Sequence, residues 1–367
     1  MTTDDGDGHD RSAAMVYLVL SHSRIPQLLR LIRTLRSGSP QATVVVHHDG
    51  RVEPLDTALA LEAGADHVIG APEPVWWGDL SMVEALLRSL RWIDENVDYD
   101  WVVQLSGQDY PSRPLRDLER HLALGSAEGY VRHERVGSER EVGVLPADPM
   151  VRRYFFRYRH LPGGRVVSRL VERPQGHRQA RAVSPAPFPG PTAAGGAGVQ
   201  PGGRTGSAGT PWRRFLDALR RVPLHITVLP RGLGTTVGWR VRSTPFVADY
   251  PCWKGSFWTT LSRPAVREVL AVIDGRLELL AHYRQTMGPE ESVLPTVLAN
   301  SPNVRLSAEP LRFVSWIDGS AHPRSLGIED LSAIEASNAF VARKFNETVD
   351  AEILDALDRR LRTVAAS

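Results

Sequence analysis

Two lysines stand out among the basic residues of this chain. Lysine and arginine together number 44, yet only Lys254 and Lys344 are lysine. Such an excess of arginine is typical of a coding genome rich in G and C. A lysine that is kept in this background can act as a compact point charge against a phosphate, with chance survival as the alternative. Both lie in short motifs, KGSFW at 254–258 and VARKF at 341–345.

Two other groups have residue types that bind a divalent metal. Asp98 and Asp100 form the D-x-D pattern that many sugar-nucleotide transferases use for a metal ion. They precede an expected strand, so their side chains should point away from a site at its carboxyl end. His47 and His48 lie beside Asp49, but adjacent strand residues point to opposite faces, which favours core or strand-end roles. We therefore predict no bound metal and no cofactor, and keep metal binding by either group as the alternative.

Composition and common motifs exclude several classes of protein. The net charge is +2 and the charges are mixed along the chain, which gives no electrostatic footprint for a nucleic acid. The single cysteine, Cys252, excludes an intrachain disulfide framework. The sequence contains no P-loop, strand–helix GxGxxG, CxxC or HExxH motif. An acidic, polar start and the lack of a run of 18 apolar residues predict a soluble cytoplasmic protein, which we expect to be bacterial.

The elements that must position these residues alternate between strand and helix. Apolar, β-rich runs predict strands, and apolar residues at helical spacing predict helices between them. This alternation predicts an α/β fold with a mainly parallel central sheet flanked by helices. Polar residues follow three strands, at Ser21–Ser23, His47–Gly50 and Ser106–Pro111, and ligands bind at the carboxyl ends of such strands. The expected strands are 15–20, 43–46, 67–69 and 101–105, and the expected helices 25–35, 80–93, 264–273, 290–299, 329–336 and 350–364.

Four segments make up the predicted organisation. Residues 1–14 are polar and predict a disordered tail. Residues 15–160 form the first half of one α/β domain. Residues 161–211 are rich in Gly, Pro, Ala, Ser and Arg and predict a mobile insertion. Residues 212–367 form the second half of the domain.

Eight short blocks, none of them specific alone, follow one another in the order of a known family. Together they resemble the core-2/I-branching β-1,6-N-acetylglucosaminyltransferase family (glycosyltransferase family 14), which also contains the peptide O-xylosyltransferases. The blocks are YLVLSH at 17–22, HHD at 47–49, VWWGDLSMVEA at 75–85, LSGQDYP at 105–111, GSFW at 255–258, PEES at 289–292, RFVSW at 312–316 and FVARKF at 340–345.

The resemblance implies a GT-A-type glycosyltransferase fold, with a nucleotide-binding first half and an acceptor and catalytic second half. It also implies a UDP-sugar donor of the GlcNAc or xylose class, inversion at the anomeric carbon, and catalysis without a bound metal. The acceptor is a hydroxyl of a glycan, peptide or small metabolite. Three positions depart from the family pattern: Asp79 replaces the second Gly of W-G-G, Glu290 replaces an Asp, and Val341 replaces an Ala.

The resemblance also assigns the groups that act on the leaving diphosphate and the acceptor proton. Glu291 matches the catalytic general base, and a helix start would stabilise its anion; a plain N-terminal helix carboxylate is the alternative. Lys344 and Arg312 match the diphosphate-binding cations, with Arg343 as their neighbour. The alternative for Arg343 and Lys344 is a solvated surface pair, although the apolar residues around them favour partial burial.

The remaining assignments concern the nucleoside and the sugar. Asp49 and Trp77 match the nucleoside site, with Trp76 as the fallback for stacking and core packing as the alternative for either indole. Asp109 can line the donor sugar, hold its loop or cap the segment that follows. The other predicted residues of the sugar and acceptor pocket are Gln108, Gly255, Ser256 and Trp258.

Two rival functions follow from the same residues. One is a metal-dependent GT-A transferase. The other is a nucleotide-sugar-binding protein without catalysis, for which Asp79 and the insertion leave room. A nucleic-acid binder is disfavoured, because aromatic and arginine side chains do not interleave in one stretch. Oligomeric state, donor sugar and linkage are not fixed by the sequence.

Overall fold

The chain divides into two compact units in its computed structural model, residues 1–157 together with 241–367, and residues 158–240. The predicted tail, except for its last two residues, and the predicted insertion at 161–211 lie outside the described residues. The structure describes residues 13–137, 149–160, 224–229, 234–241, 243–317 and 323–365.

A seven-stranded sheet forms the centre of the first unit, which confirms the predicted α/β fold. Four of its neighbouring pairs are parallel, and only β12 runs antiparallel to both of its neighbours, β4 and β6. The strand order is β13-β6-β12-β4-β1-β2-β3. The strands are β1 (Met15–Ser21), β2 (Thr43–His48), β3 (His67–Gly70), β4 (Trp101–Ser106), β6 (Gly129–Tyr130), β12 (Thr260–Ser262) and β13 (Leu306–Ser307).

Two apolar cores, one on each face of the sheet, explain why the strand runs are almost continuously hydrophobic. Along β1, Tyr17 and Val19 belong to one core and Val16 and Leu18 to the other. Successive strand residues point to opposite faces. A strand that is covered on both sides therefore has no face exposed to water, and most of its residues are apolar.

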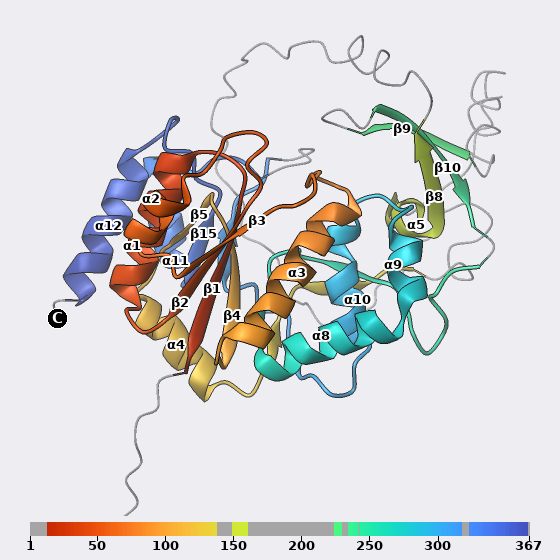
Figure 1. Ribbon diagram of the computed structural model, residues 1–367, viewed down its shortest axis with the longest axis horizontal. Helices are drawn as coiled ribbons and strands as arrows, with labels where there is room; N and C mark the ends of the chain where they lie inside the picture. Colours follow the sequence, from red (N-terminus) through yellow and green to blue (C-terminus); the bar gives the residue numbers. More distant parts are fainter. Residues whose placement is uncertain are drawn as a thin grey trace, which may run out of the picture. The chain divides into compact units, whose positions relative to one another are not determined.

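Helices cover both faces of the sheet (Figure 1). On one side lie α1 (Ile25–Gly38), α2 (Thr57–Glu62), α4 (Leu115–Leu124) and α12 (Glu352–Ala365). On the other lie α3 (Leu80–Asn96), α8 (Arg263–Gly275) and α10 (Val293–Ala299). In α1 the buried Leu28, Leu31, Ile32 and Leu35 recur at helical spacing, and each contributes roughly 1.5–3 kcal/mol by full burial.

Small sheets and short helices complete the first unit. A three-stranded sheet has the order β14-β15-β5, and β11 pairs with β7. Within the described residues, no helix is both long and apolar enough to cross a membrane. The elements are β5 (Asp109–Pro111), β7 (His133–Arg135), α5 (Pro149–Phe155), β11 (Trp253–Gly255), α9 (Leu277–Tyr283), η1 (Pro289–Glu291), β14 (Arg312–Val314), η2 (Ile328–Asp330), α11 (Leu331–Ala336) and β15 (Val341–Arg343).

The predicted helix over 290–299 is wrong at its start. A 3-10 turn, η1, comes first, and α10 begins only at Val293. Ser292 separates them with a non-helical backbone, and its hydroxyl donates to the carbonyl of Trp253 at 2.6 Å. The predicted helix over 329–336 likewise begins as a 3-10 turn, η2. Sequence periodicity also missed α2, α4 and α9, which are short.

The second unit contains a three-stranded sheet of order β8-β10-β9. A Cβ on Gly238 of β10 would lie 2.4 Å from the ring of Tyr158, so only glycine fits there. The strands of this sheet are β8 (Phe156–His160), β9 (Leu224–Leu229) and β10 (Gly234–Arg240).

Candidate active site

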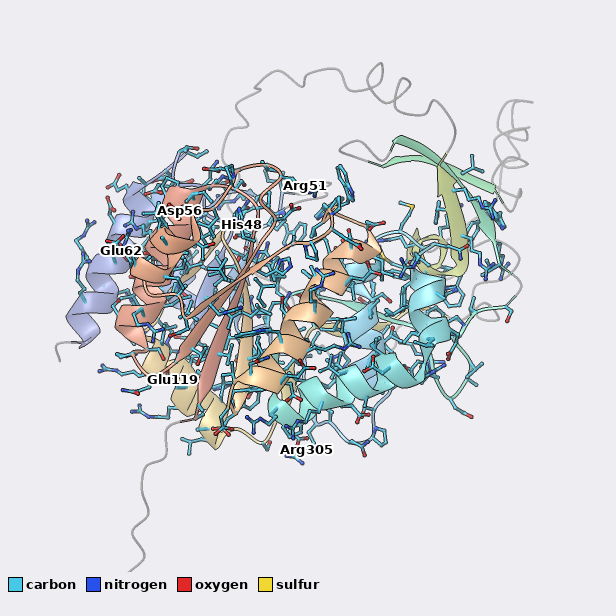
Figure 2. The ribbon with its side chains drawn as sticks, in the orientation of Figure 1. His48, Arg51, Asp56, Glu62, Glu119 and Arg305 are labelled. Carbon is cyan, nitrogen blue, oxygen red and sulfur yellow. The ribbon has the colours of Figure 1, made fainter. Side chains whose placement is uncertain are left out.

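Polar residues gather where β1, β2 and β4 end. The Ser21 hydroxyl lies 2.8 Å from Nδ1 of His48, and Nε2 of the same imidazole lies 2.7 Å from the carbonyl of Glu53. The amide of Gly107 donates to the carbonyl of Leu20 at 3.0 Å. Figure 2 shows His48 and Arg51 toward the upper end of the sheet, with Glu119 and Arg305 labelled at the lower end. The three loops that follow these strands are therefore tied together at one edge.

Asp49 lies at this edge, immediately after β2, and is buried. The Nε of Arg51 donates to its two carboxylate oxygens at 2.9 and 3.0 Å, and Nη2 donates to Oδ2 at 2.5 Å. The amide of Val75 donates to the same Oδ2 at 3.2 Å. Burial raises the pKa of this carboxyl, but the hydrogen bonds and charge of Arg51 outweigh it and the pKa is lowered. The predicted nucleoside residue is therefore an anion held by an arginine that sequence reasoning missed.

Two indoles lie on the loop between β3 and α3. Trp76 and Trp77 are each 39% exposed, and the Arg51 guanidinium lies 4.5 Å from the ring centroid of Trp76. The Ser81 hydroxyl accepts from the Trp76 amide at 2.8 Å, which fixes the loop to the first turn of α3. Both indoles are therefore partly exposed, and simple core packing is not their role in the described structure.

The departure from the family at Asp79 has a local explanation. Asp79 is the N-cap of α3, and its carboxylate accepts from the Ser81 amide at 2.9 Å. Gly78, just before it, has φ of 77°, in the left-handed region that favours glycine. Asp79, which stands where the family has a glycine, therefore stabilises the start of α3.

Two guanidinium groups and one carboxylate form a buried cluster between β5, β14 and β15. Arg343 faces Asp109 across the antiparallel pair of β15 and β5, with Nε 3.5 Å from Oδ1. Arg312 on β14 is also buried and donates from Nη2 to the carbonyls of Gln104 and Thr259. Nε and Nη1 of both arginines are buried without a hydrogen-bond acceptor among the described residues.

Burial also perturbs the titration of these groups. It lowers the pKa of Arg312 to about 10, an effect that Asp109 opposes and the charge of Arg343 reinforces. Burial likewise lowers the pKa of Arg343, again opposed by Asp109. One carboxylate therefore faces two positive charges. Asp109 does not cap the following helix, because its oxygens accept instead from the amide and hydroxyl of Ser106, at 3.1 and 2.7 Å.

Of the predicted sugar and acceptor residues, Trp258 contacts this cluster directly. The Arg343 guanidinium lies 4.2 Å from the ring centroid of Trp258. The Ser256 hydroxyl accepts from the Trp258 amide at 3.0 Å, a local turn rather than a helix contact. A Cβ on Gly255 would come within 1.6 Å of the Arg132 carbonyl, so the tight pairing of β11 with β7 requires glycine. Gln108 is half-buried, and its carbonyl accepts from the Phe345 amide at 2.8 Å.

Two adjacent glutamates of η1 lie in different surroundings. Oε2 of Glu291 lies 2.7 Å from Nη1 of Arg153, and the Glu291 side chain is 38% exposed. Glu290 is buried, and its Oε2 has no partner among the described residues. Burial, helped by the charges of Glu291 and Asp79, raises the pKa of Glu290 to about 8. The predicted base is therefore the exposed, oriented member of the pair.

Hydrogen bonds between loops connect these groups around the edge of the sheet. The amide of Gly288 donates to the carbonyl of Gly78 at 3.1 Å, which joins the Trp76–Asp79 loop to η1. The Ser292 hydroxyl, next to Glu291, joins η1 to β11. Lys344 follows Arg343 at the end of β15 and is half-buried. No direct contact joins Glu291 to the arginine cluster among the described residues.

Several residues with candidate chemistry lie elsewhere. Asp98 pairs with Arg263 at 2.5 Å, and Asp100 accepts from the amide of Ala14, both before β4 begins. Lys254 lies 3.3 Å from Glu134. Burial lowers the pKa of His47 to about 4, with Arg88 contributing. Within the described residues, no three His, Cys, Asp or Glu side chains are grouped as metal ligands.

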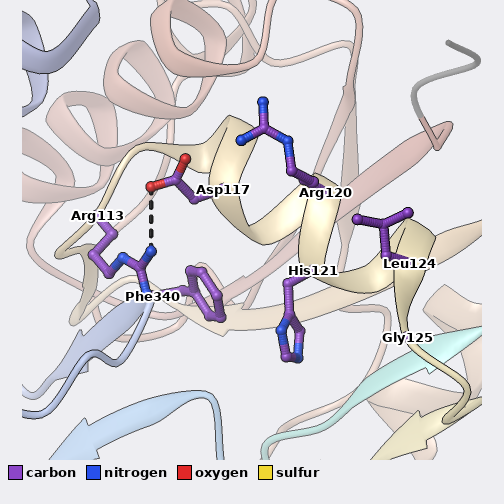
Figure 3. A pocket seen from close by; sticks show the side chains of 7 residues that line it. All are labelled: Arg113, Asp117, Arg120, His121, Leu124, Gly125 and Phe340. Atoms are coloured by element: carbon purple, nitrogen blue, oxygen red, sulfur yellow. Dashed lines mark hydrogen bonds and ion pairs between the residues drawn. The ribbon is translucent and has the colours of Figure 1, made fainter.

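A surface pocket lies along α4, apart from the carboxyl edge (Figure 3). Arg113 donates to Asp117 at 3.3 Å and lies 4.6 Å from the ring centroid of Phe340. His121 is 3.9 Å from Glu309. None of the predicted site residues lines this pocket.

The site residues that sequence reasoning missed are cations paired with predicted carboxylates. Arg51 lies two residues after Asp49, and an arginine so close to a strand-end aspartate was the available signal. Arg153 is on α5, far from Glu291 in the sequence, and no local pattern marked it. Gln104 and Thr259, which accept from Arg312 through their carbonyls, carry no side-chain signal.

The fold is α/β with a mainly parallel sheet, and proteins of this class bind their ligands at the carboxyl ends of the strands. The family model "Branch: Core-2/I-Branching enzyme" matches residues 15–141 and 240–338, which is more than half of the chain. The chain belongs to the Core-2/I-Branching enzyme family.

Two curated relatives come from Arabidopsis thaliana. The beta-glucuronosyltransferase GlcAT14A is 30% identical over 129 residues, 34% of this chain and 28% of that protein. The beta-glucuronosyltransferase GlcAT14B is 29% identical over 130 residues, 34% of this chain and 29% of that protein. The matched region therefore spans less than a third of either relative.

Solved structures show only faint likeness. HddC from Yersinia pseudotuberculosis matches at a TM-score of 0.24 and 10% identity, over 34% of this chain and 59% of that one. Glucosyl-3-phosphoglycerate synthase from Mycobacterium tuberculosis matches at a TM-score of 0.23 and 21% identity, over 38% of this chain and 50% of that one. Likenesses this low say nothing about the function of this chain.

Proposed function

We propose that this protein moves a sugar from a UDP-sugar to an acceptor hydroxyl with inversion, giving a β-linkage. We further propose that side-chain cations, and not a bound metal ion, offset the charge of the leaving diphosphate. The observation that supports this most is the cluster around the single carboxylate of Asp109, in which Arg312 is buried and the Arg343 side chain is only 12% exposed.

A buried charge is costly unless it is paired. Two guanidinium groups against one carboxylate leave about one positive charge without a fixed counterion in the described part of the chain, at a place where ligands of this fold class bind. A diphosphate supplies that counterion, and Lys344 follows Arg343 directly in the chain. Arg312 lies deeper than Arg343, so we assign it to the electric field beneath the diphosphate and assign the direct contacts to Arg343 and Lys344. Preorganised charges of this kind act most strongly on the charge that develops in the transition state.

Glu291 is the proposed general base. As the acceptor oxygen forms its bond to C1, the bond from C1 to the β-phosphate oxygen breaks and its electron pair leaves with UDP. The acceptor proton passes to the Glu291 carboxylate. Arg153 holds Oε2 of that carboxylate, while Oε1 has no hydrogen bond among the described residues. Positioned base catalysis of this kind contributes about 10²–10⁴-fold.

Asp49 and the indoles of Trp76 and Trp77 form the proposed nucleoside end, with Trp77 as the predicted stacking residue. Gln108, Asp109, Gly255, Ser256 and Trp258 form the proposed sugar and acceptor end. The donor sugar is of the GlcNAc or xylose class, and the names of the Arabidopsis relatives add glucuronic acid to the sugars to be tried.

The test is transfer from these three UDP-sugars to glycan, peptide and small hydroxyl acceptors, with EDTA or with Mn²⁺. We expect turnover that EDTA does not reduce. We expect Glu291→Gln to lower kcat by at least 10²-fold and leave UDP affinity within about twofold. Glu84→Gln is the matched control, because Glu84 pairs with Arg284 at 2.7 Å in another part of the chain; its turnover should match wild type.

The other outcomes each favour a rival. A requirement for Mn²⁺ would replace the cation mechanism with a metal-dependent one. UDP binding without turnover on any donor would favour a nucleotide-sugar-binding protein that has lost catalysis. Activity of Glu291→Gln within a few-fold of wild type would remove Glu291 as the base.

A further inference from the structure

The carboxylate of Asp49 has no hydrogen-bonding capacity left for a ligand. A carboxylate offers about four lone-pair sites. Oδ1 accepts from the backbone amide and Nε of Arg51, at 3.3 and 2.9 Å. Oδ2 accepts from Nε and Nη2 of Arg51 and from the amide of Val75, at 3.0, 2.5 and 3.2 Å. A nucleoside that donates a hydrogen bond to Asp49 must therefore first displace a donor already there.

The same guanidinium also covers an indole. It lies 4.5 Å from the ring centroid of Trp76, and its Nη2 donates to the carbonyl of Val75. One side chain thus occupies both the acceptor and one of the aromatic surfaces proposed for the nucleoside. Because the Arg51 side chain is 35% exposed, it can leave for solvent without unpacking a core.

We infer that Arg51 is an affinity-determining residue that competes with the nucleoside of the donor for Asp49. The inference rests on the proposed function, which puts the nucleoside at this carboxylate. In the free protein Arg51 closes the nucleoside site, and binding exchanges the Asp49–Arg51 hydrogen bonds for bonds from the ligand. When a site is open for only a fraction of the time, its apparent Kd is the intrinsic Kd divided by that fraction, so binding is weaker. Contrary to the usual effect of removing an arginine near a nucleotide, its loss tightens binding.

The chain supplies a matched control at the opposite end of the sheet. Arg263 donates to Asp98 at 2.5 Å and to the carbonyl of Val97 at 3.4 Å, and lies 4.7 Å from the ring centroid of Tyr99. It makes the same three kinds of contact as Arg51, to a carboxylate, a valine carbonyl and an aromatic ring. Arg263→Met therefore removes an equivalent set of contacts without touching the proposed site.

The experiment is a calorimetric titration of UDP into the full chain and its variants. We expect Arg51→Met to bind UDP about tenfold more tightly than wild type, the size expected for breaking a partly exposed bidentate pair. Arg51→Lys keeps the positive charge but loses the planar fork, so it should also bind more tightly. Arg263→Met should bind as wild type does.

The double variant with Asp49→Asn and Arg51→Met tests the nucleoside contact at Asp49 separately from the competition by Arg51. We expect it to weaken UDP binding about tenfold, which would place the nucleoside at Asp49. If it does so while Arg51→Met binds no more tightly than wild type, competition by Arg51 is overturned and the nucleoside contact stands. Weaker binding by Arg51→Met with normal binding by Arg51→Lys would mean that Arg51 attracts the diphosphate as a cation, which also overturns it. If Asp49→Asn changes nothing, the nucleoside lies elsewhere and both proposals fail.

Discussion

Two neighbouring carboxyl groups can take different roles when their surroundings differ. Glu291 reaches partial exposure and is oriented by Arg153, whereas Glu290 is buried behind it on the same 3-10 turn. Asp79 from α3 and Arg153 and Tyr154 from α5 face Glu290. The residue that departs from the family pattern is thus the one that stays protonated at neutral pH, while its neighbour carries the proposed chemistry.

The raised pKa of Glu290 makes folding stability depend on pH. Its pKa of about 8 lies above the ordinary value of 4.5, so the folded state holds its proton more tightly than the unfolded chain. The free energy of unfolding is therefore greatest below pH 4.5. It falls as the pH rises from 4.5 to about 8 and levels off above that. Glu290→Gln removes this dependence. We expect the variant to match wild type near pH 5 and to be more stable by a few kcal/mol near pH 9.

Urea unfolding of both proteins from pH 5 to 9 measures the difference. Glu62→Gln on α2 controls for the loss of one carboxylate at an exposed position. A difference between wild type and Glu290→Gln that is constant across this range would mean that Glu290 is already ionised when folded.

At the scale of elements, the start of α3 tests whether Asp79 is a helix cap or a sign of lost catalysis. Asp79 accepts from the Ser81 amide, and replacing an N-cap Asp by Ala costs about 1 kcal/mol, whereas Gly costs a few tenths. We therefore expect Asp79→Ala to lower the free energy of unfolding by about 1 kcal/mol and Asp79→Gly to change it little. Both should keep the transfer activity, and chemical denaturation with a turnover assay checks this.

The matched control for this element is Asp56, the N-cap of α2, which accepts from the Ala58 amide at 2.9 Å. Asp56→Ala should cost a similar free energy. If Asp79→Gly instead raised activity strongly above wild type, Asp79 would be a catalytic defect and not merely a cap.

The sequence predicted the long elements well because their signal is local. The apolar stripe of α1 and the buried runs of β1, β2 and β4 carry their period within one segment. The break between η1 and α10 could not be predicted, because it depends on the contact of Ser292 with β11, a distant segment. Short helices such as α2 present too few residues for a period to appear.

At the scale of the whole molecule, the site is harder to predict than the fold because its parts meet through tertiary contacts. The motifs at Asp49 and Asp109 marked carboxylates that follow β2 and β4, and the motif at Glu291 marked one on η1. Their partners were not marked: Arg153 belongs to an element with no motif, and the pairing of Arg343 with Asp109 depends on β15 running beside β5. A motif shows which residue types are present, while their charge balance appears only after folding.

This charge balance links the stability of the whole chain to its ligand. Asp109→Asn leaves Arg312 and Arg343 buried without their carboxylate, so we expect a loss of about 3–5 kcal/mol of folding stability. Under the proposed function UDP binds the folded state and its diphosphate replaces the missing negative charge, so saturating UDP should restore more stability to the variant than it adds to wild type. Urea unfolding without UDP measures the stability that the substitution removes, and unfolding with UDP measures the stability that the ligand restores.

Asp330→Asn provides the comparison, since Asp330 is a buried carboxylate that pairs with Arg324 and not with an arginine of the cluster. It should also destabilise the chain, but UDP should add no more to it than to wild type. Equal gains from UDP in Asp109→Asn and Asp330→Asn would mean that the arginine cluster stabilises the fold without meeting the diphosphate. A larger gain in Asp109→Asn alone would tie the stability of that cluster to the ligand, because the two variants differ in where the unpaired positive charge lies.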